Sequence, residues 1–87
     1  MELKELPNIG DFLMGQLHQV GITTKEQLEA IGSEEAWLKI QAIDPSACYH
    51  RLCALEGAIQ GIPKKDLKES DKEHLRAFYR THKKSDN

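Results

Sequence analysis

Apolar residues recur every third or fourth position along almost the whole chain. In residues 11–20 they fall at Leu13, Leu17 and Val20. The longest such run, residues 46–62, has apolar positions at spacings of four and three: Cys48, Leu52, Leu55, Ile59 and Ile62. This spacing places apolar side chains on one face of an α-helix, whereas the alternation that is typical of strands is absent. The pattern therefore predicts an all-α fold.

Turn and capping residues divide the chain into about five helices after a short helical turn near residue 3. We predict helices at about residues 11–20, 24–31, 33–43, 46–60 and 71–82. The capping residues proposed for the later helices are Thr23 with Glu26 or Thr24 with Gln27, then Ser33, Ser46, and Ser70 with Glu73. We expect a compact bundle with the 46–60 helix at its centre.

The core positions follow from the same periodicity. In the third helix we expect Ala36, Ile40 and Ile43 to face inward, and in the last helix Leu75 and Phe78. Gly57 interrupts the most apolar helix, where a glycine costs about 1 kcal/mol relative to alanine. We therefore expect another helix to approach the chain closely at Gly57.

Two stretches of the sequence together resemble a known family. The first runs from the Leu6–Gly10 turn to Gly32, and the second is the helix at residues 52–62, which contains Ala54–Ala58 and is followed by Asp66 and Leu67. The pattern is similar to the C-terminal domain of the TfoX/Sxy-type competence regulators. The resemblance implies a compact helical domain with a helix-hairpin-helix-like N-terminal half. It also implies a stand-alone form of a domain linked to bacterial transcription control and DNA uptake.

The chain length and charge limit the possible partners. The 87 residues fit one helical domain at residues 1–82, followed by a frayed basic tail at residues 83–87. The formal net charge is −2, with four basic against nine acidic side chains in residues 1–63 and eight against five in residues 64–87. Nucleic-acid binders gain most of their affinity by neutralising phosphates, so only the C-terminal segment suits a polyanion.

The Pro7–Gly10 turn is the first candidate site for nucleic acid, with Asn8 and Gly10 as the contact residues. Glycine-containing turns of helix-hairpin-helix motifs expose backbone N–H groups that hold a phosphate without reading sequence. Here Asp11 follows the turn, where it would repel a phosphate and satisfy the helix N-terminus itself. We therefore favour a structural role for the turn.

The basic residues of the C-terminal segment form the second candidate site: Lys64, Lys65, Lys68, Lys72, Arg76, Arg80, Lys83 and Lys84. Lys68, Lys72, Arg76 and Arg80 recur at every fourth position and so form one ridge on, or leading into, the last helix. Such a ridge can follow a phosphate backbone, but interleaved acidic residues are also typical of an ordinary solvated helix face. We favour the second interpretation.

A possible partner surface includes Trp37, Tyr49 and Glu56. Trp37 and Tyr49 are aromatic residues of the kind that is enriched at protein interfaces, and the sequence alone does not separate this role from a place at the core edge. Glu56 lies within an apolar helix, where a carboxylate needs hydrogen-bond partners. For Glu56 we favour a structural role.

No combination of residues forms a recognisable reaction centre. Nucleophile elbows, P-loops and paired-glycine nucleotide fingerprints are absent. Cys48, His50 and Cys53 lack a nearby fourth ligand, which structural zinc requires. We interpret both cysteines as reduced thiols, which is typical of a cytoplasmic protein. No apolar run is long enough to cross a membrane.

We therefore expect a cytoplasmic, non-enzymatic binding module without cofactor or metal. Its favoured partner is another protein. The alternative is weak, sequence-independent DNA binding through the Pro7–Gly10 turn and the basic ridge. The sequence leaves the oligomeric state open.

Overall fold

The computed structural model describes residues 2–84, which form five α-helices and two short 3₁₀ turns. In chain order these elements are η1 (Leu3–Glu5), α1 (Asp11–Gln19), α2 (Lys25–Ile31), α3 (Ser33–Ile43), α4 (Tyr49–Gln60), η2 (Lys64–Asp66) and α5 (Glu69–His82). Within the described range the only β-type pairing is an isolated bridge between Glu2 and Thr24, so the predicted all-α fold is confirmed. Lys83 and Lys84 follow α5 without helical structure. The rest of the predicted frayed tail, residues 85–87, lies outside the described residues.

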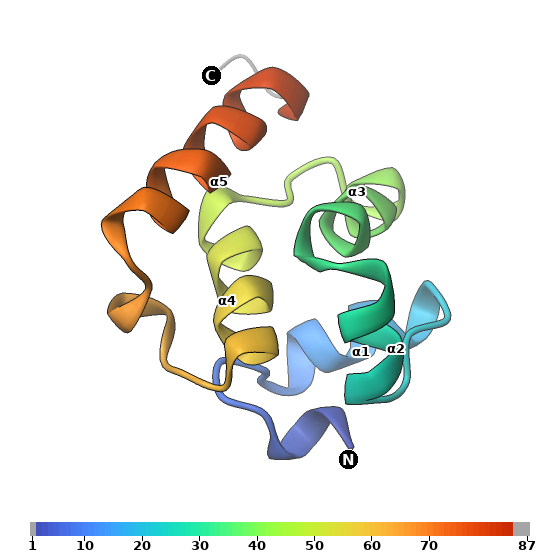
Figure 1. Cartoon of the computed structure of the whole chain (residues 1–87). Helices are drawn as coiled ribbons and strands as arrows, with labels where there is room; N and C mark the ends of the chain where they lie inside the picture. Colours follow the sequence, from blue (N-terminus) through green and yellow to red (C-terminus); the bar gives the residue numbers. More distant parts are fainter. Residues whose placement is uncertain (1, 85–87) are drawn as a thin grey trace.

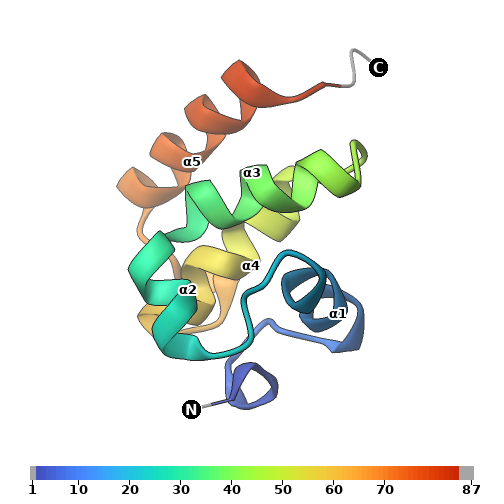
Figure 2. The ribbon, with the colours of Figure 1, turned by 90° about the vertical axis from the view of Figure 1, so that its right-hand side faces the viewer.

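Helix α4 lies at the centre of the molecule, between α3 and α5 (Figure 1). Six of its twelve residues are buried, because apolar or small residues occur on almost every side of this helix. Helix α4 also packs against α2 and η2. The N-terminal η1 and the C-terminal end of α5 lie at opposite ends of the molecule (Figures 1 and 2). The prediction of a central fourth helix is therefore confirmed.

Trp37 of α3 is fully buried, with 0% of its surface exposed. Its indole Nε1 donates a hydrogen bond to the Cys48 carbonyl oxygen at 3.0 Å. Its ring packs edge-on against Phe78 and Tyr79 of α5, with centroids 6.1 and 5.8 Å away. The contacts among these three aromatic rings thus hold α5 against α3. The expectation that Trp37 contributes to a partner surface is wrong, because its ring fills the space between these helices.

Some helix ends are set by local sequence as predicted. Thr24 caps α2 by accepting a hydrogen bond from the Gln27 N–H at 3.1 Å, which selects this register over the alternative pair of Thr23 and Glu26. Gly61 ends α4 in the left-handed conformation, with φ of 78°. Glycine adopts this conformation at little cost, which explains why the helix ends there.

Other helix starts differ from the prediction. Gly32, with φ of 87°, precedes α3, and Ser33 is its first helical residue rather than its cap. The Ser33 hydroxyl is buried and donates a hydrogen bond to Glu56 of α4 at 2.7 Å. Its partner is therefore a side chain on another helix rather than a backbone N–H of α3. Helix α5 begins at Glu69, before the predicted Ser70–Glu73 capping pair, and its N-cap makes no side-chain hydrogen bond.

Helix α4 begins at Tyr49 rather than Ser46 because Asp44 closes a turn in front of it. The Asp44 carboxylate accepts hydrogen bonds from the Ser46 N–H at 3.0 Å and from the Ser46 hydroxyl at 2.6 Å. The Ala47 N–H bonds to the Asp44 carbonyl oxygen at 3.0 Å. Asx turns of this kind compete with helix formation, which delays the start of α4.

Asp44 also connects three helices. Its Oδ2 accepts a hydrogen bond from Arg51 of α4 at 2.7 Å and from Gln16 of α1 at 2.9 Å. The hydrogen bond from the Ser46 hydroxyl, followed by those from Arg51 and Gln16, lowers the pKa of Asp44 well below its usual value. The ionised form of Asp44 is therefore the form that the fold stabilises.

We expect Asp44→Asn to remove part of the acid sensitivity of the protein. Because the folded-state pKa is depressed, the stabilisation is present above the unfolded value of 3.8 and is lost as the pH falls toward the folded pKa. The variant should have a Tm several degrees lower at neutral pH and a flatter decline of Tm in acid. Circular dichroism melting between about pH 2 and pH 6 measures both effects. Parallel curves for the two proteins would contradict this role.

The C-terminal end of α3 corrects one core prediction. Ala36 and Ile40 are fully buried as expected, but Ile43 is 49% exposed. Gln41 is buried instead and donates to the His82 carbonyl oxygen at 2.7 Å. The buried face of α3 is centred near Trp37 and Ile40, and at about 100° per residue Ile43 lies roughly a quarter-turn from that centre.

Candidate functional site

Asn8 holds the Pro7–Gly10 turn against the C-terminal half of α4. Its backbone has φ of 70°, a left-handed conformation that asparagine tolerates better than most residues. Its side-chain Nδ2 donates to the carbonyl oxygens of Ala54 at 3.4 Å and Ile62 at 3.0 Å, and its Oδ1 accepts from the Lys64 N–H at 3.0 Å. The Asn8 side chain, which was predicted to contact nucleic acid, thus already uses both of its polar atoms in hydrogen bonds within the protein.

Gly57 is required by this turn. A Cβ atom at Gly57 would lie 2.5 Å from Asn8 Nδ2 and 2.8 Å from the Ile62 carbonyl oxygen. Two groups therefore approach α4 closely at Gly57: the side-chain amide of Asn8 and the backbone carbonyl of Ile62. The expectation that another helix approaches at this point is wrong. The contact joins the two stretches of sequence that carried the family resemblance.

Gly10 does not have the geometry of a dedicated phosphate cradle. It precedes α1 with φ of −89°, a conformation open to any residue, and a Cβ there would meet nothing within 4 Å. Asp11 follows as an exposed first helical residue, where its carboxylate interacts favourably with the helix N-terminus. These observations support the structural interpretation of the turn.

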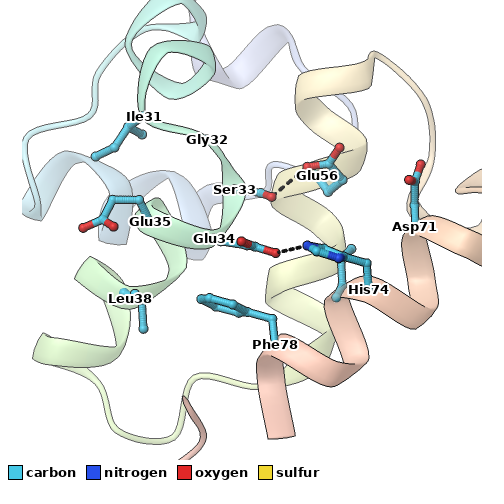
Figure 3. Close-up of a pocket in the computed structure, with 11 residues that line it drawn as sticks. Ile31, Gly32, Ser33, Glu34, Glu35, Leu38, Glu56, Asp71, His74 and Phe78 are labelled. Carbon is cyan, nitrogen blue, oxygen red and sulfur yellow. Dashed lines mark hydrogen bonds and ion pairs between the residues drawn. The ribbon is translucent and has the colours of Figure 1, made fainter. Parts of the chain in front are cut away.

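A depression of about 440 Å³ lies between α5 and the start of α3 (Figure 3). Its apolar part includes Leu38 of α3 and Leu75 and Phe78 of α5, and the Phe78 ring extends toward Leu38. Four carboxylates line the same depression, and we call it the acidic groove: Glu34, Glu35, Glu56 and Asp71. Helices α3, α4 and α5 all contribute to this surface.

Two contacts connect the walls of the acidic groove. Glu34 Oε2 lies 2.9 Å from His74 Nε2, which joins α3 to α5. Glu56 accepts the Ser33 hydroxyl through one oxygen, and its other oxygen accepts from Gln60 Nε2 at 2.7 Å. Both oxygens of Glu56 therefore have partners within the chain. This geometry supports the structural role favoured for Glu56 and makes it part of the groove wall.

The acidic groove has a strong charge imbalance. Among residues 2–84, His74 is the only side chain with a titratable nitrogen that lines it, against four carboxylates. The Glu35 carboxylate extends away from α5, on the outer side of the groove (Figure 3). Such a surface attracts cationic groups, while its apolar part favours burial of apolar side chains.

The basic ridge on α5 divides into two kinds of residue. Lys68 and Arg80 are exposed, whereas Lys72 and Arg76 are half-buried. The Arg76 guanidinium carbon lies 5.5 Å from the centre of the Tyr49 ring. The ridge is therefore not a uniform solvated face, because Arg76 is held against Tyr49 of α4 and Lys72 donates a hydrogen bond to the Lys65 carbonyl oxygen of η2.

The residues beside Tyr49 include two cations of the predicted basic C-terminal segment that lie outside the ridge. Lys64 and Lys65 of η2 line a second depression, of about 280 Å³, together with Lys72 and Arg76. These lysines lie on a separate 3₁₀ turn, so helical spacing gave no signal that connects them to α5. Only the path of the chain between α4 and α5 brings the two sets together.

Tyr49, like Glu56, is a member of the predicted partner surface that stays partly exposed. Its hydroxyl donates to the Lys72 carbonyl oxygen at 3.2 Å, and its ring packs against Tyr79. Burial, followed by the neighbouring Cys53, raises the pKa of the Tyr49 phenol. The hydroxyl therefore keeps its proton at neutral pH and remains a donor.

The described residues hold no obvious metal site. Cys48 and Cys53 are both free thiols, Cys48 half-buried and Cys53 buried. Among residues 2–84, no three His, Cys, Asp or Glu side chains are grouped so that they could hold a metal ion. Within the same range, no helix combines the length and the apolar character needed to cross a membrane.

Comparison with protein families identifies the chain. The family model described as the TfoX C-terminal domain matches residues 1–79. The chain belongs to this family. The TfoX C-terminal domain predicted from the Pro7–Gly10 turn and the Ala54–Ala58 helix is thus confirmed. Comparison with curated proteins gives no match.

Two crystal structures of Listeria monocytogenes proteins are similar to this TfoX C-terminal domain. One, an uncharacterized protein in a triclinic form, has a TM-score of 0.92 and 44% identity, over 93% of this chain and 92% of that chain. The other, a protein of unknown function in a tetragonal form, has a TM-score of 0.89 and 46% identity, over 91% of this chain and 96% of that chain. These relatives support the fold of the domain and carry no assigned activity.

Both candidate surfaces of this TfoX C-terminal domain depend on the position of α5. The acidic groove lies on the side of α5 that faces α3, and the basic residues lie on the side that faces Tyr49 and η2. The two surfaces share no lining residue. Their functions are therefore separable by substitution.

Proposed function

We propose that this TfoX C-terminal domain is a cytoplasmic, non-enzymatic regulatory module that binds another protein in the competence-type setting of its family. The observation that carries the proposal is the acidic groove, in which apolar side chains and carboxylates line one depression. The partner that fits this groove is a cationic amphipathic segment, such as one face of a helix.

The groove supports this partner through both of its components. Leu38 and Phe78 are half-buried, so an apolar side chain seated between them would remove further apolar surface from water. Glu34 and Asp71 lie on opposite helices, which places acceptors on both sides of an inserted segment. Recognition of an amphipathic helix in a groove commonly uses this combination of apolar anchors and charged edges.

The position of the carboxylate with the most strongly shifted pKa fits the proposed non-enzymatic role. Catalytic sites usually bring a group with a strongly shifted pKa into a cleft. The carboxylate whose pKa is most clearly lowered is Asp44, which holds Ser46, Arg51 and Gln16 in place. Asp44 lines neither of the two depressions. Tyr49, whose phenol pKa is raised, does line the second depression, where its hydroxyl donates to the Lys72 carbonyl oxygen.

Weak, sequence-independent DNA binding is the second candidate, and the cluster of cations near Tyr49 favours it. The Pro7–Gly10 turn adds little to this candidate, because Asn8 is bonded to α4 and η2 and Asp11 is negatively charged. DNA binding of this kind should fall steeply as the salt concentration rises.

A titration with a defined cationic peptide tests the protein-binding proposal. We expect a short helical peptide of leucine and lysine to shift backbone amide resonances of residues 31–38 and 71–78 in ¹⁵N-labelled protein. Glu34→Lys with Asp71→Lys should weaken binding at least about tenfold, because two favourable charges become repulsive. Glu29→Lys with Glu73→Lys is the matched control, since it changes the net charge equally at two exposed positions outside the groove.

An equal loss of affinity in both double variants would show that only net charge matters and would contradict the groove. Equal binding of a leucine–glutamate peptide would contradict it as well. Steep, salt-dependent retardation of duplex DNA, without any response to the cationic peptide, would favour the second candidate. Circular dichroism of each variant establishes that the helices are intact.

A further inference from the structure

We propose that a basic pocket on the other side of α5 binds a phosphate monoester with a small apolar body. The pocket has a volume of about 280 Å³ and is formed by α4, η2 and α5. The residues that define it are Tyr49, Cys53, Lys64, Lys65, Lys72 and Arg76. This site is independent of the acidic groove and of the proposed protein partner.

The pocket concentrates positive charge that no lining residue neutralises. Of the described residues, four cationic side chains from two separate segments line it, and no carboxylate does. Glu69 is near enough to Tyr49 to affect the pKa of the phenol, but it does not line the pocket. Four like charges around one depression repel one another. An anion bound among them would be attracted to each cation and would offset that repulsion.

Two of the cations are already held in place. Lys72 Nζ donates a hydrogen bond to the Lys65 carbonyl oxygen at 3.2 Å, and the ammonium group has further protons for a ligand. The Arg76 guanidinium is held over the Tyr49 ring by a cation–π contact. Because these side chains are ordered before binding, the entropy cost of binding an anion is reduced.

The size and lining of the pocket indicate that its ligand has an organic group in addition to the phosphate. The volume lies near the lower end of small-molecule sites, and it exceeds what a phosphate group alone would fill. The lining includes the half-buried Tyr49, the buried Cys53 and the exposed His50. An apolar or aromatic group would therefore be placed against Tyr49 and Cys53.

The charge of the site favours a phosphate monoester over other anions. At pH 7 a monoester carries a charge of about −1.5 to −2 and three strong acceptor oxygens, whereas a carboxylate carries a single charge. A guanidinium and several ammonium groups suit such an oxygen-rich dianion. A single small depression has room for one terminal phosphate, which sets it apart from a groove that follows a nucleic-acid backbone.

Titration of ¹⁵N-labelled protein with phenyl phosphate, inorganic phosphate and benzoate tests the ligand chemistry. We expect phenyl phosphate to bind most tightly and to shift the amide resonances of residues 49–53, 64–65 and 72–76. The affinity should fall as the salt concentration rises. An eight-nucleotide strand with a 5′-phosphate, compared with the same strand ending in a 5′-hydroxyl, and 5′-AMP distinguish a strand end from a free metabolite as the source of the monoester.

Paired substitutions locate the binding. Lys64→Ala with Lys65→Ala removes two exposed cations from the pocket, and we expect at least about a tenfold loss of affinity for phenyl phosphate. Lys72→Ala with Arg76→Ala should have a similar effect. The matched control is Lys68→Ala with Arg80→Ala, which removes the same charge from exposed positions outside the pocket and should change the affinity less than about twofold.

Three results would overturn the proposal. The first is equal binding of benzoate and phenyl phosphate. The second is an equal loss of affinity in the control pair and in the Lys64/Lys65 pair, which would mean that the protein senses only overall charge. The third is the absence of resonance shifts at millimolar phenyl phosphate. Circular dichroism separates loss of binding from loss of folding, and the Lys64/Lys65 pair changes no side chain that the fold buries.

Discussion

We expect Trp37→Ala to remove a large part of the free energy of unfolding of the protein. Removal of a fully buried tryptophan costs about 3–5 kcal/mol, against a total stability of about 5–15 kcal/mol for a typical domain. The loss is large here because the indole is 0% exposed and packs against both Phe78 and Tyr79. The Cys48 carbonyl oxygen would lose its hydrogen-bond donor in addition.

The measurement is urea unfolding followed by circular dichroism at 222 nm, because the variant lacks the only tryptophan of the chain. Trp37→Phe is the informative companion, since it retains an aromatic ring and loses the N–H. It should cost about 1–3 kcal/mol, from the unsatisfied Cys48 carbonyl oxygen and the smaller ring. A loss below about 1 kcal/mol for Trp37→Ala would contradict the central position of this residue.

The second large effect is expected for Gly57→Ala, and its sign is opposite to that of most such substitutions. Glycine to alanine inside a helix usually stabilises by about 1 kcal/mol. At Gly57 the new methyl group would meet Asn8 Nδ2 and the Ile62 carbonyl oxygen, at distances that real Cβ contacts do not show. The turn at Asn8 would have to move and lose its hydrogen bonds to α4, so we expect a net destabilisation of about 2 kcal/mol.

Gly15→Ala is the matched control for Gly57→Ala. Gly15 also lies inside a helix, α1, but it is exposed and a Cβ there would meet nothing within 4 Å. This variant should gain about 0.5–1 kcal/mol. Urea unfolding of both variants decides the prediction, which would be contradicted if the two substitutions changed the free energy of unfolding in the same direction.

Asn8→Gly tests the partner side of the same contact. Glycine accepts the left-handed backbone of Asn8, so the substitution mainly removes the side-chain hydrogen bonds. Combined with Gly57→Ala, it removes the nearer of the two clashing atoms and leaves the Ile62 carbonyl oxygen. We therefore expect the double variant to be less destabilised than the sum of the single variants, as coupled neighbours usually are.

Helix α5 contributes both to the stability of the fold and to the two proposed binding sites. Trp37 holds the Phe78 end of this helix against α3, and the acidic groove and the basic pocket lie on its two sides. Trp37→Ala should therefore weaken binding to both the cationic peptide and phenyl phosphate. The surface variants should instead affect only one ligand each, which separates loss of a site from loss of the fold.

The amino-acid sequence by itself determined the helical class and the central position of α4. Apolar spacing of three and four is a local property, and Leu52 and Leu55 are fully buried as that spacing predicts. The Thr24 cap, one of two registers left open, and the Gly61 helix end are also local, because each involves a side chain or backbone conformation within a few residues. The family was recognisable from the same short motifs.

The tertiary structure alone decided which face of α3 is buried, where α4 begins, and what surrounds Gly57. Trp37 and Gln41 are buried because of how α3 is rotated against α4 and α5, and that rotation depends on all the helices together. The acidic groove and the basic pocket arise in the same way, from segments far apart in the chain that meet only when α5 docks. Periodicity reports which residues share one helix face, whereas a binding site depends on the distances between faces, and those are set by packing.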